Sequence, residues 1–182
     1  MIVDAHFHCW RLARGDYGWL TPALAPIHRD VSVDDWRREA ELDALMLAGR
    51  YSLLDHSALP ELLPLCTARG VRIALGGAFN SGLLATGARS GGVARFNYAP
   101  AAQAWVERTA QIEVVCDAHR VPLRAAALQF PLAHPAVDVV MVGARSAAEW
   151  QDALAMVQQP IAPAFWDDLR AAGLLPALAP TP

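Results

Sequence analysis

Three short apolar runs mark the second part of the chain, at residues 42–48, 71–75 and 137–142. Each run is followed directly by a glycine, and each is too short for a buried helix. Apolar runs of this length between turn residues are typical of buried strands. We therefore predict one strand at each of the three runs.

Helical periodicity fills the intervals between these runs. Leu59, Leu62 and Cys66 recur at helical spacing before Gly70, which predicts a helix over residues 57–69 that ends at the glycine. The same pattern predicts four more helices, over residues 103–119, 123–133, 146–157 and 165–172. Strands that alternate with helices in this way favour a parallel sheet covered by helices. The proline-rich end of the chain is expected to be loosely held.

The first forty residues follow a different pattern. An apolar run at residues 1–5 predicts a further strand, and Ser32 is a candidate N-cap for a helix over residues 36–40. Most of the other residues in this segment are of types common in turns, so we predict loops there. About four parallel strands amount to half of a (β/α)8 barrel, which usually needs about 250 residues. The predicted fold class is therefore α/β, a partial (β/α)8 TIM-type barrel, built from segments 1–40 and 41–182.

Composition narrows the function classes. The chain has 182 residues, 54% of them hydrophobic, and a formal net charge of −3. Nucleic-acid binding needs concentrated positive charge, so no nucleic-acid partner is expected. No apolar run is long enough to span a membrane and no signal-peptide pattern is visible, which favours a cytoplasmic protein. The three cysteines, Cys9, Cys66 and Cys116, favour reduced thiols over a disulfide framework.

The basic residues carry a second constraint. All 15 of them are arginine, and the sequence contains no lysine. A P-loop lysine, a Schiff-base lysine and lysine-assisted proton transfer are therefore excluded for this chain.

Two loops that follow predicted strands have the chemistry of phosphate sites. Residues 76–84 contain three glycines and other small residues, so backbone N–H groups can approach a phosphate, and Asn80 and Ser81 can add side-chain bonds. Residues 143–146 open a helix, whose N-terminus favours an anion, and Arg145 can hold a phosphate through two N–H groups. The alternative interpretations are an ordinary turn and an ordinary helix cap. Ligands of parallel α/β sheets bind at the carboxyl ends of strands, which favours the phosphate interpretation.

Residues 41–182 resemble the C-terminal portion of an aldo-keto reductase, in the sugar-oxidising branch that includes L-fucose dehydrogenase (D-threo-aldose 1-dehydrogenase). The segments that carry the resemblance occur in order: LMLAGRYSLLDHSALPELLPLC, GGAFNSGLLATG, FNYAP, PLRAAALQFPLAHPAV and VVMVGARSAAEW. The resemblance implies that the three predicted strands are strands 6, 7 and 8 of the family's barrel. It also implies NAD(P)-dependent oxidation of an aldose such as L-fucose to its lactone.

The same resemblance implies a cofactor site, whose residues fall into three groups. The group that would line the pyrophosphate is Phe79, Asn80, Ser81 and Gly82. The group that would meet the adenosine ribose or its 2′-phosphate is Gly143, Arg145 and Ser146. Asp152 would lie near the adenine. Three positions depart from the family pattern. Ala153 replaces an asparagine, Ala48 replaces the glutamine that holds the nicotinamide amide, and Gly76 replaces the aromatic residue that stacks on nicotinamide.

The catalytic tetrad of that family, Asp, Tyr, Lys and His, has no counterpart in this sequence, so we assign no catalytic residue and expect the reaction to be impaired. Tyr51 follows a predicted strand, but a tyrosine with an ordinary pKa near 10 is a poor proton donor, and local packing is the simpler interpretation. The alternative is that the chain, with segments 1–40 and 41–182 of different origin, is a non-catalytic hybrid. Such a protein would at most bind the phosphates of a dinucleotide. An open half-barrel also favours self-association, because its edge strands lack partners.

The N-terminus carries a separate signal, His6 and His8, which share one face of a strand and can point at one metal ion. Catalytic zinc needs about three protein ligands, so a divalent metal is not expected. Residues 2–40, including GDYGWLTPALAPIHRD, resemble the start of an amidohydrolase related to L-fuconolactonase. That resemblance implies a metal-dependent sugar lactonase as a distant alternative.

Overall fold

The computed structural model describes residue 13 and residues 21–25, 28–30 and 43–182. The chain divides into two units, Met1–Leu45 and Met46–Pro182. In the first unit the described residues form a short 3-10 helix, η2 (Pro22–Leu24), which begins with a proline after Thr21. The strand predicted at residues 1–5, the helix predicted at residues 36–40 and the His6–His8 pair lie outside the described residues.

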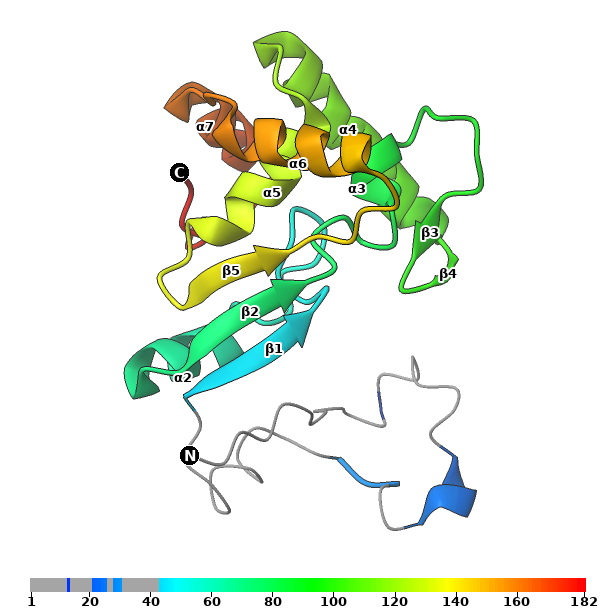
Figure 1. The fold of residues 1–182 in the computed structure, drawn as a ribbon, viewed down its shortest axis with the longest axis vertical. Coiled ribbons are helices and arrows are strands. Elements are labelled where there is room, and N and C mark those ends of the chain that lie inside the picture. Colours follow the sequence, from blue (N-terminus) through cyan, green and yellow to red (C-terminus); the bar gives the residue numbers. More distant parts are fainter. Residues whose placement is uncertain (1–12, 14–20, 26–27, 31–42) are drawn as a thin grey trace. The chain divides into compact units, whose positions relative to one another are not determined.

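A sheet of three strands organises the rest of the chain (Figure 1). The strands are β1 (Ala44–Ala48), β2 (Arg72–Gly76) and β5 (Val137–Met141), in the order β1-β2-β5. The central and last strands, β2 and β5, pair in parallel, and the three arrows in Figure 1 run in the same direction. The three predicted strands and the parallel sheet are thus confirmed. In the part of the chain that the structure describes, the sheet is a partial barrel and does not close.

The sheet is packed mainly on one face. In β1 the buried residues are Leu45 and Leu47, while Met46 between them is 61% exposed. Ile73 and Leu75 continue the packed face into β2. The prediction of a buried strand therefore holds for one face of β1, because successive side chains point to opposite faces and the described helices cover one of them.

Among residues 43–182, six helices accompany the sheet, namely α2 (Leu62–Arg69), α3 (Leu83–Thr86), α4 (Gln103–His119), α5 (Leu123–Leu132), α6 (Ala147–Gln158) and α7 (Pro163–Ala171). The helix predicted over residues 103–119 has the bounds predicted for it, and α5, α6 and α7 begin or end within two residues of the prediction. Helix α2 begins later than predicted. Residues 57–61 form turns instead, because Leu59 precedes Pro60 and a residue before proline disfavours the helical conformation. Gly70 ends α2 in the left-handed conformation, as predicted.

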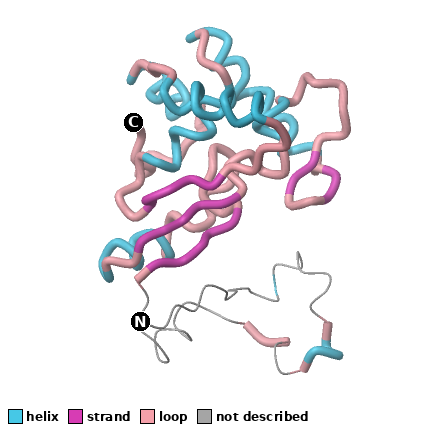
Figure 2. The backbone as a smooth tube through the Cα atoms, in the orientation of Figure 1, coloured by secondary structure: helices cyan, strands magenta, loops and turns pink. Residues whose placement is uncertain are grey.

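Within residues 43–182, three elements were not predicted, the short helix α3 and the two strands of a hairpin, β3 (Arg95–Phe96) and β4 (Ala99–Pro100). Figure 2 shows this hairpin as a second, smaller pair of strands apart from the main sheet. The turn between its strands is Asn97-Tyr98, and both residues have positive φ, 50° and 65°. A two-residue turn with two left-handed residues matches the twist of a hairpin. Asn97 was the available signal, because asparagine tolerates this conformation.

Helix α5 is the centre of the packing and contacts α3, α4, α6 and β5. Ala125, Ala126 and Ala127 are fully buried, and such small side chains let neighbouring helices approach closely. At the other end of the helix, Phe130 packs against three aromatic rings, two from the loop after β1 and one from α7. The ring centroids of Tyr51, His56 and Trp166 lie 5.0, 5.7 and 6.4 Å from that of Phe130.

The proline-rich end is held in place, contrary to the prediction of a loose tail. Arg170 on α7 donates to the carbonyl oxygen of Ala179 and to the hydroxyl of Thr181, at 3.1 and 2.7 Å. Ala179 is only 2% exposed. A single arginine fork thus ties the final residues to the helix that precedes them.

The burial of His56 generates a testable pH dependence. Desolvation, and then the nearby charge of Arg108, lower the pKa of His56 from 6.5 to about 4, while Asp55 acts in the opposite direction. The unfolded chain therefore binds more protons than the folded chain between these pH values, so stability falls as the pH falls from 6.5 to 4. The corresponding loss in the free energy of unfolding is about 3 kcal/mol.

We expect His56→Phe, which keeps an aromatic ring against Phe130, to show a smaller loss of stability between pH 7 and pH 4. Urea unfolding of both proteins across this range checks the difference. Equal pH slopes for the parent and the variant would contradict the assignment to His56.

Candidate functional site

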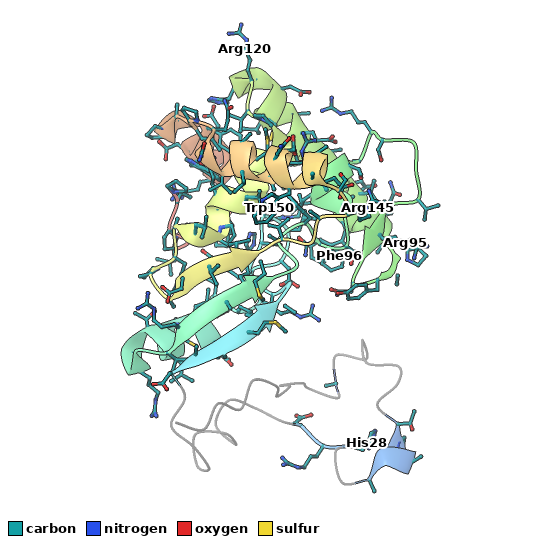
Figure 3. All side chains as sticks on the ribbon, viewed as in Figure 1. His28, Arg95, Phe96, Arg120, Arg145 and Trp150 are labelled. Carbon is teal, nitrogen blue, oxygen red and sulfur yellow. The ribbon has the colours of Figure 1, made fainter. Side chains whose placement is uncertain are left out.

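The carboxyl ends of the three strands lie together. Gly76 at the end of β2 is opposite Met141 at the end of β5, so the loops that follow these strands leave the sheet at the same edge. The backbone N–H of Gly49, just after β1, donates to the carbonyl oxygen of Gly76 at 2.8 Å. In Figure 3, Arg145 lies beyond the arrowhead of β5, on this side of the sheet. The two loops singled out in the sequence therefore start from one edge.

Glycine is required where the loop after β2 meets the loop after β1. Gly77 has a φ of +72°, and a Cβ atom there would lie 3.2 Å from the backbone nitrogen of Gly49. A larger residue would have a strained backbone conformation, and its side chain would also clash with the backbone of Gly49. Gly143 differs, because its φ is not in the left-handed region and a Cβ there would have no neighbour within 4 Å.

The loop after β2 adopts a left-handed conformation at three successive residues. Asn80, Ser81 and Gly82 have φ values of 46°, 57° and 97°. Within the loop the N–H of Asn80 donates to Gly77 and the N–H of Gly82 donates to Phe79. The backbone N–H groups of Phe79 and Ser81 have no acceptor among the described residues, so the loop can offer both of them to an anion.

Side chains from neighbouring segments hold this loop on both sides. Ser52, in the loop after β1, donates from its hydroxyl to Oδ1 of Asn80 at 2.6 Å. On the other side, the hydroxyl of Ser81 accepts from the backbone N–H of Tyr98 at 2.9 Å, which connects the loop to the hairpin. The hairpin is anchored in turn by Phe96, whose ring stacks on that of Trp105 at 4.3 Å.

The loop after β5 is arranged as a helix cap. Ser146 is the N-cap of α6, and its hydroxyl accepts from the N–H of Glu149 at 3.2 Å. The Glu149 carboxylate accepts from the backbone N–H of Arg145 at 2.7 Å and from its guanidinium Nη2 at 2.7 Å. Hydrogen bonds with Arg145 lower the pKa of Glu149, and the same pairing raises the pKa of Arg145. A carboxylate of the chain itself thus holds the arginine predicted to bind phosphate.

The Arg145 side chain remains open to a ligand despite this pairing. It is 91% exposed, and Glu149 occupies Nε and Nη2 of its guanidinium. An exposed ion pair of this kind is screened by solvent and contributes little to stability. A phosphate with more charge than a carboxylate can therefore displace Glu149 at low cost.

Asp152 is engaged in a different contact from the one that the family resemblance implies. Its carboxylate accepts two hydrogen bonds from Arg124 on α5, at 2.8 and 3.0 Å. Both side chains are about 40% exposed. This ion pair joins α6 to α5, so in this structure Asp152 connects two helices.

Tyr51 is a packed residue. It is fully buried, its ring contacts Phe130 and His134, and its hydroxyl has no hydrogen-bond partner among the described residues. Burial raises the pKa of Tyr51 above its ordinary value. Both the burial and the raised pKa oppose proton transfer to a ligand, in agreement with the packing interpretation of this residue.

Sequence reasoning missed four residues that shape this edge, namely Ser52, Tyr98, Arg124 and Glu149. Only Glu149 had a local signal, because Ser146 and Glu149 have the spacing of a capping box. Ser52 and Arg124 each act on a residue 28 positions away.

Two further observations concern the described residues alone. No three of their histidine, cysteine, aspartate and glutamate side chains are grouped in a way that could hold a metal ion. No helix among them is long and apolar enough to cross a membrane.

Comparisons with known proteins agree with this architecture. The chain is 42% identical over 151 residues to a pyridoxal 4-dehydrogenase from Microbacterium luteolum, a match that covers 80% of this chain and 44% of that protein. It is 38% identical over 141 residues to a D-threo-aldose 1-dehydrogenase from a Pseudomonas species, covering 76% of this chain and 42% of that protein. The chain thus spans less than half the length of these two relatives.

Solved structures give the same fold. An aldo-keto reductase from Bacillus halodurans in its holo form superposes with a TM-score of 0.60 at 22% identity, over 81% of this chain and 47% of that chain. A glycerol dehydrogenase from Gluconobacter oxydans superposes with a TM-score of 0.53 at 17% identity, over 79% of this chain and 47% of that chain. The sequence profile of the Aldo/keto reductase family matches residues 28–173, and the chain therefore belongs to that family.

Proposed function

We propose that this chain binds the phosphate-bearing part of a nicotinamide dinucleotide at the carboxyl edge of its sheet. The observation that carries the proposal is the register of β2 and β5, because Gly76 opposite Met141 brings both candidate phosphate loops to one edge. Ligands of parallel α/β sheets bind at this edge. The family membership supports the same ligand class.

The groups present fit a dinucleotide in their chemistry. The N–H groups of Phe79 and Ser81 are available for pyrophosphate oxygens, beside the left-handed turn at Gly82. At the second loop, the first N–H groups of a helix have no intrahelical partner and favour an anion. Arg145 adds a positive charge there, suited to the ribose or its 2′-phosphate.

The reaction is a further part of the proposal. The similarity to a D-threo-aldose 1-dehydrogenase favours an aldose as the substrate. The resemblance noted in the sequence implies oxidation of a sugar such as L-fucose to its lactone, in which a bound NAD(P)+ would take the hydride from the anomeric carbon and water would take the hydroxyl proton. Within this chain, however, Tyr51 is buried and the sequence contains no lysine. We therefore assign cofactor binding to this chain and propose that aldose oxidation by the chain alone is impaired.

The cofactor proposal predicts opposite effects of two substitutions at one ion pair. Arg145→Ala removes a charge-assisted contact, so we expect the Kd for NADPH to rise about tenfold and that for NADH to rise less. Glu149→Gln frees Arg145 from its competing carboxylate, so we expect the Kd for NADPH to fall about threefold. Half-exposed Trp150, on the same helix, supplies the fluorescence signal.

Arg69→Ala is the matched control, because Arg69 is an exposed arginine in the last turn of α2. No saturable signal from the unaltered protein at millimolar NADH or NADPH would refute the binding proposal. Reduction of NAD+ or NADP+ in the presence of L-fucose would refute the proposed impairment, while leaving the binding proposal intact.

Gly143 allows a separate test of ligand approach. Its backbone conformation and surroundings accept a Cβ atom, so we expect Gly143→Ala to leave the free energy of unfolding within about 0.5 kcal/mol of the parent. If a phosphate lies against this backbone, the added methyl group raises the Kd for the dinucleotide about fivefold. Urea unfolding and nucleotide titration of the same variant check both parts. An unchanged Kd would remove Gly143 from the binding site.

A further inference from the structure

The buried contact between Ser52 and Asn80 joins the loops after β1 and β2. Ser52 is fully buried and Asn80 is 3% exposed. The distance from Oγ of Ser52 to Oδ1 of Asn80 is 2.6 Å, which is a short hydroxyl hydrogen bond. Ser52 lies in a segment that carries the family resemblance, but that resemblance assigns it no role.

The direction of this hydrogen bond follows from the other partners of Ser52. Its hydroxyl oxygen accepts from the backbone N–H of Leu54 at 3.2 Å and from that of Asp55 at 3.1 Å. A hydroxyl has two acceptor lone pairs and one proton. Because both lone pairs are engaged, the proton is donated to Asn80. The partner atom on Asn80 must therefore be its carbonyl oxygen.

This requirement settles the orientation of the Asn80 carboxamide. With Oδ1 facing Ser52, Nδ2 points away from it and toward Gly49, where a Cβ atom would lie 4.0 Å from Nδ2. Nδ2 is buried and has no hydrogen-bond partner among the described residues. An enclosed N–H donor without an acceptor is costly, and an oxygen atom from water or ligand is its natural complement.

The position of this donor connects it with the dinucleotide. Asn80 begins the left-handed stretch that continues through Ser81, whose backbone N–H has no acceptor among the described residues. The carboxamide and that N–H therefore belong to one turn. The Ser52 contact also holds Asn80 in a left-handed conformation, which asparagine tolerates better than most residues.

We propose that Ser52 is a positioning residue for dinucleotide binding, which keeps Nδ2 of Asn80 as a donor to a pyrophosphate oxygen, directly or through one bound water. The proposal rests on the proposed function. Ser52 acts through Asn80 and does not itself touch the ligand. Its hydroxyl sets which end of the carboxamide faces the ligand.

The sequence permits a direct spectroscopic test, because Asn80 and Asn97 are the only asparagines in the chain. Selective ¹⁵N-asparagine labelling gives two side-chain amide signals, and Asn97 on the exposed hairpin turn is the internal control. On titration of the full chain with NADPH, and separately with inorganic pyrophosphate, we expect the Asn80 side-chain signal to shift more than that of Asn97.

A double-mutant cycle tests the dependence on Asn80. We expect Asn80→Ala to raise the Kd for NADPH about tenfold, Ser52→Ala about fivefold, and the double variant no more than Asn80→Ala alone. Ser52→Thr retains a hydroxyl and should restore most of the affinity. Asn80→Asp keeps an acceptor for Ser52 but presents a negative charge to the phosphates, and should abolish saturable binding.

The outcomes separate the two proposals. Absence of NADPH binding to the unaltered chain refutes the proposed function. If NADPH binds but the Asn80 signal does not move, the role of Ser52 and Asn80 is refuted and the function stands. Equal effects of Ser52→Ala in the parent and in the Asn80→Ala variant also refute it, because Ser52 would then act on general stability. Should Ser52→Ala fail to fold, the labelling experiment on the unaltered chain still decides.

Discussion

The parallel pairing of β2 with β5 is the interaction on which the rest of this structure depends. These strands are far apart in the sequence, and the chain between them forms α3, the hairpin, α4 and α5. Their register sets Gly76 opposite Met141, so the two loops that follow start at the same edge. Helix α5, which contacts β5 and three other helices, supports the pairing from its packed face. A slip of one residue would turn the buried side chains of β2 away from the helices.

The candidate site combines open and occupied groups. At the loop after β2, some backbone N–H groups hold the loop together, while those of Phe79 and Ser81 have no acceptor among the described residues. At the loop after β5, Glu149 already neutralises part of the Arg145 charge. The site is thus shaped before any ligand arrives, and a ligand at Arg145 must compete with a carboxylate. Weak exposed pairing makes that competition inexpensive.

Sequence reasoning predicted the elements well where the signal was local. The three apolar runs gave strands and the long helix over residues 103–119 has the predicted bounds, because burial patterns and helical spacing act over a few residues. It failed where a proline, a tight turn or a residue distant in the sequence determined the local structure. Because of Pro60, α2 begins later in the sequence than predicted. Asn97-Tyr98 forms the turn of an unpredicted hairpin, and Arg170 binds a tail that was expected to be loose. The one contact at the site with a local signal was the Ser146–Glu149 cap.

The sequence by itself determined the class of fold, the strands, the two glycine-containing loops and the absence of lysine. Each of these depends on composition or on neighbours a few residues apart. Only the tertiary structure decided that Ser52 bonds Asn80, that Asp152 pairs with Arg124, and that Tyr51 is buried. The first two contacts join residues 28 positions apart, and strand order and register bring such residues together. A hydrogen bond needs its two atoms within about 3 Å, and sequence spacing cannot specify that distance across a fold.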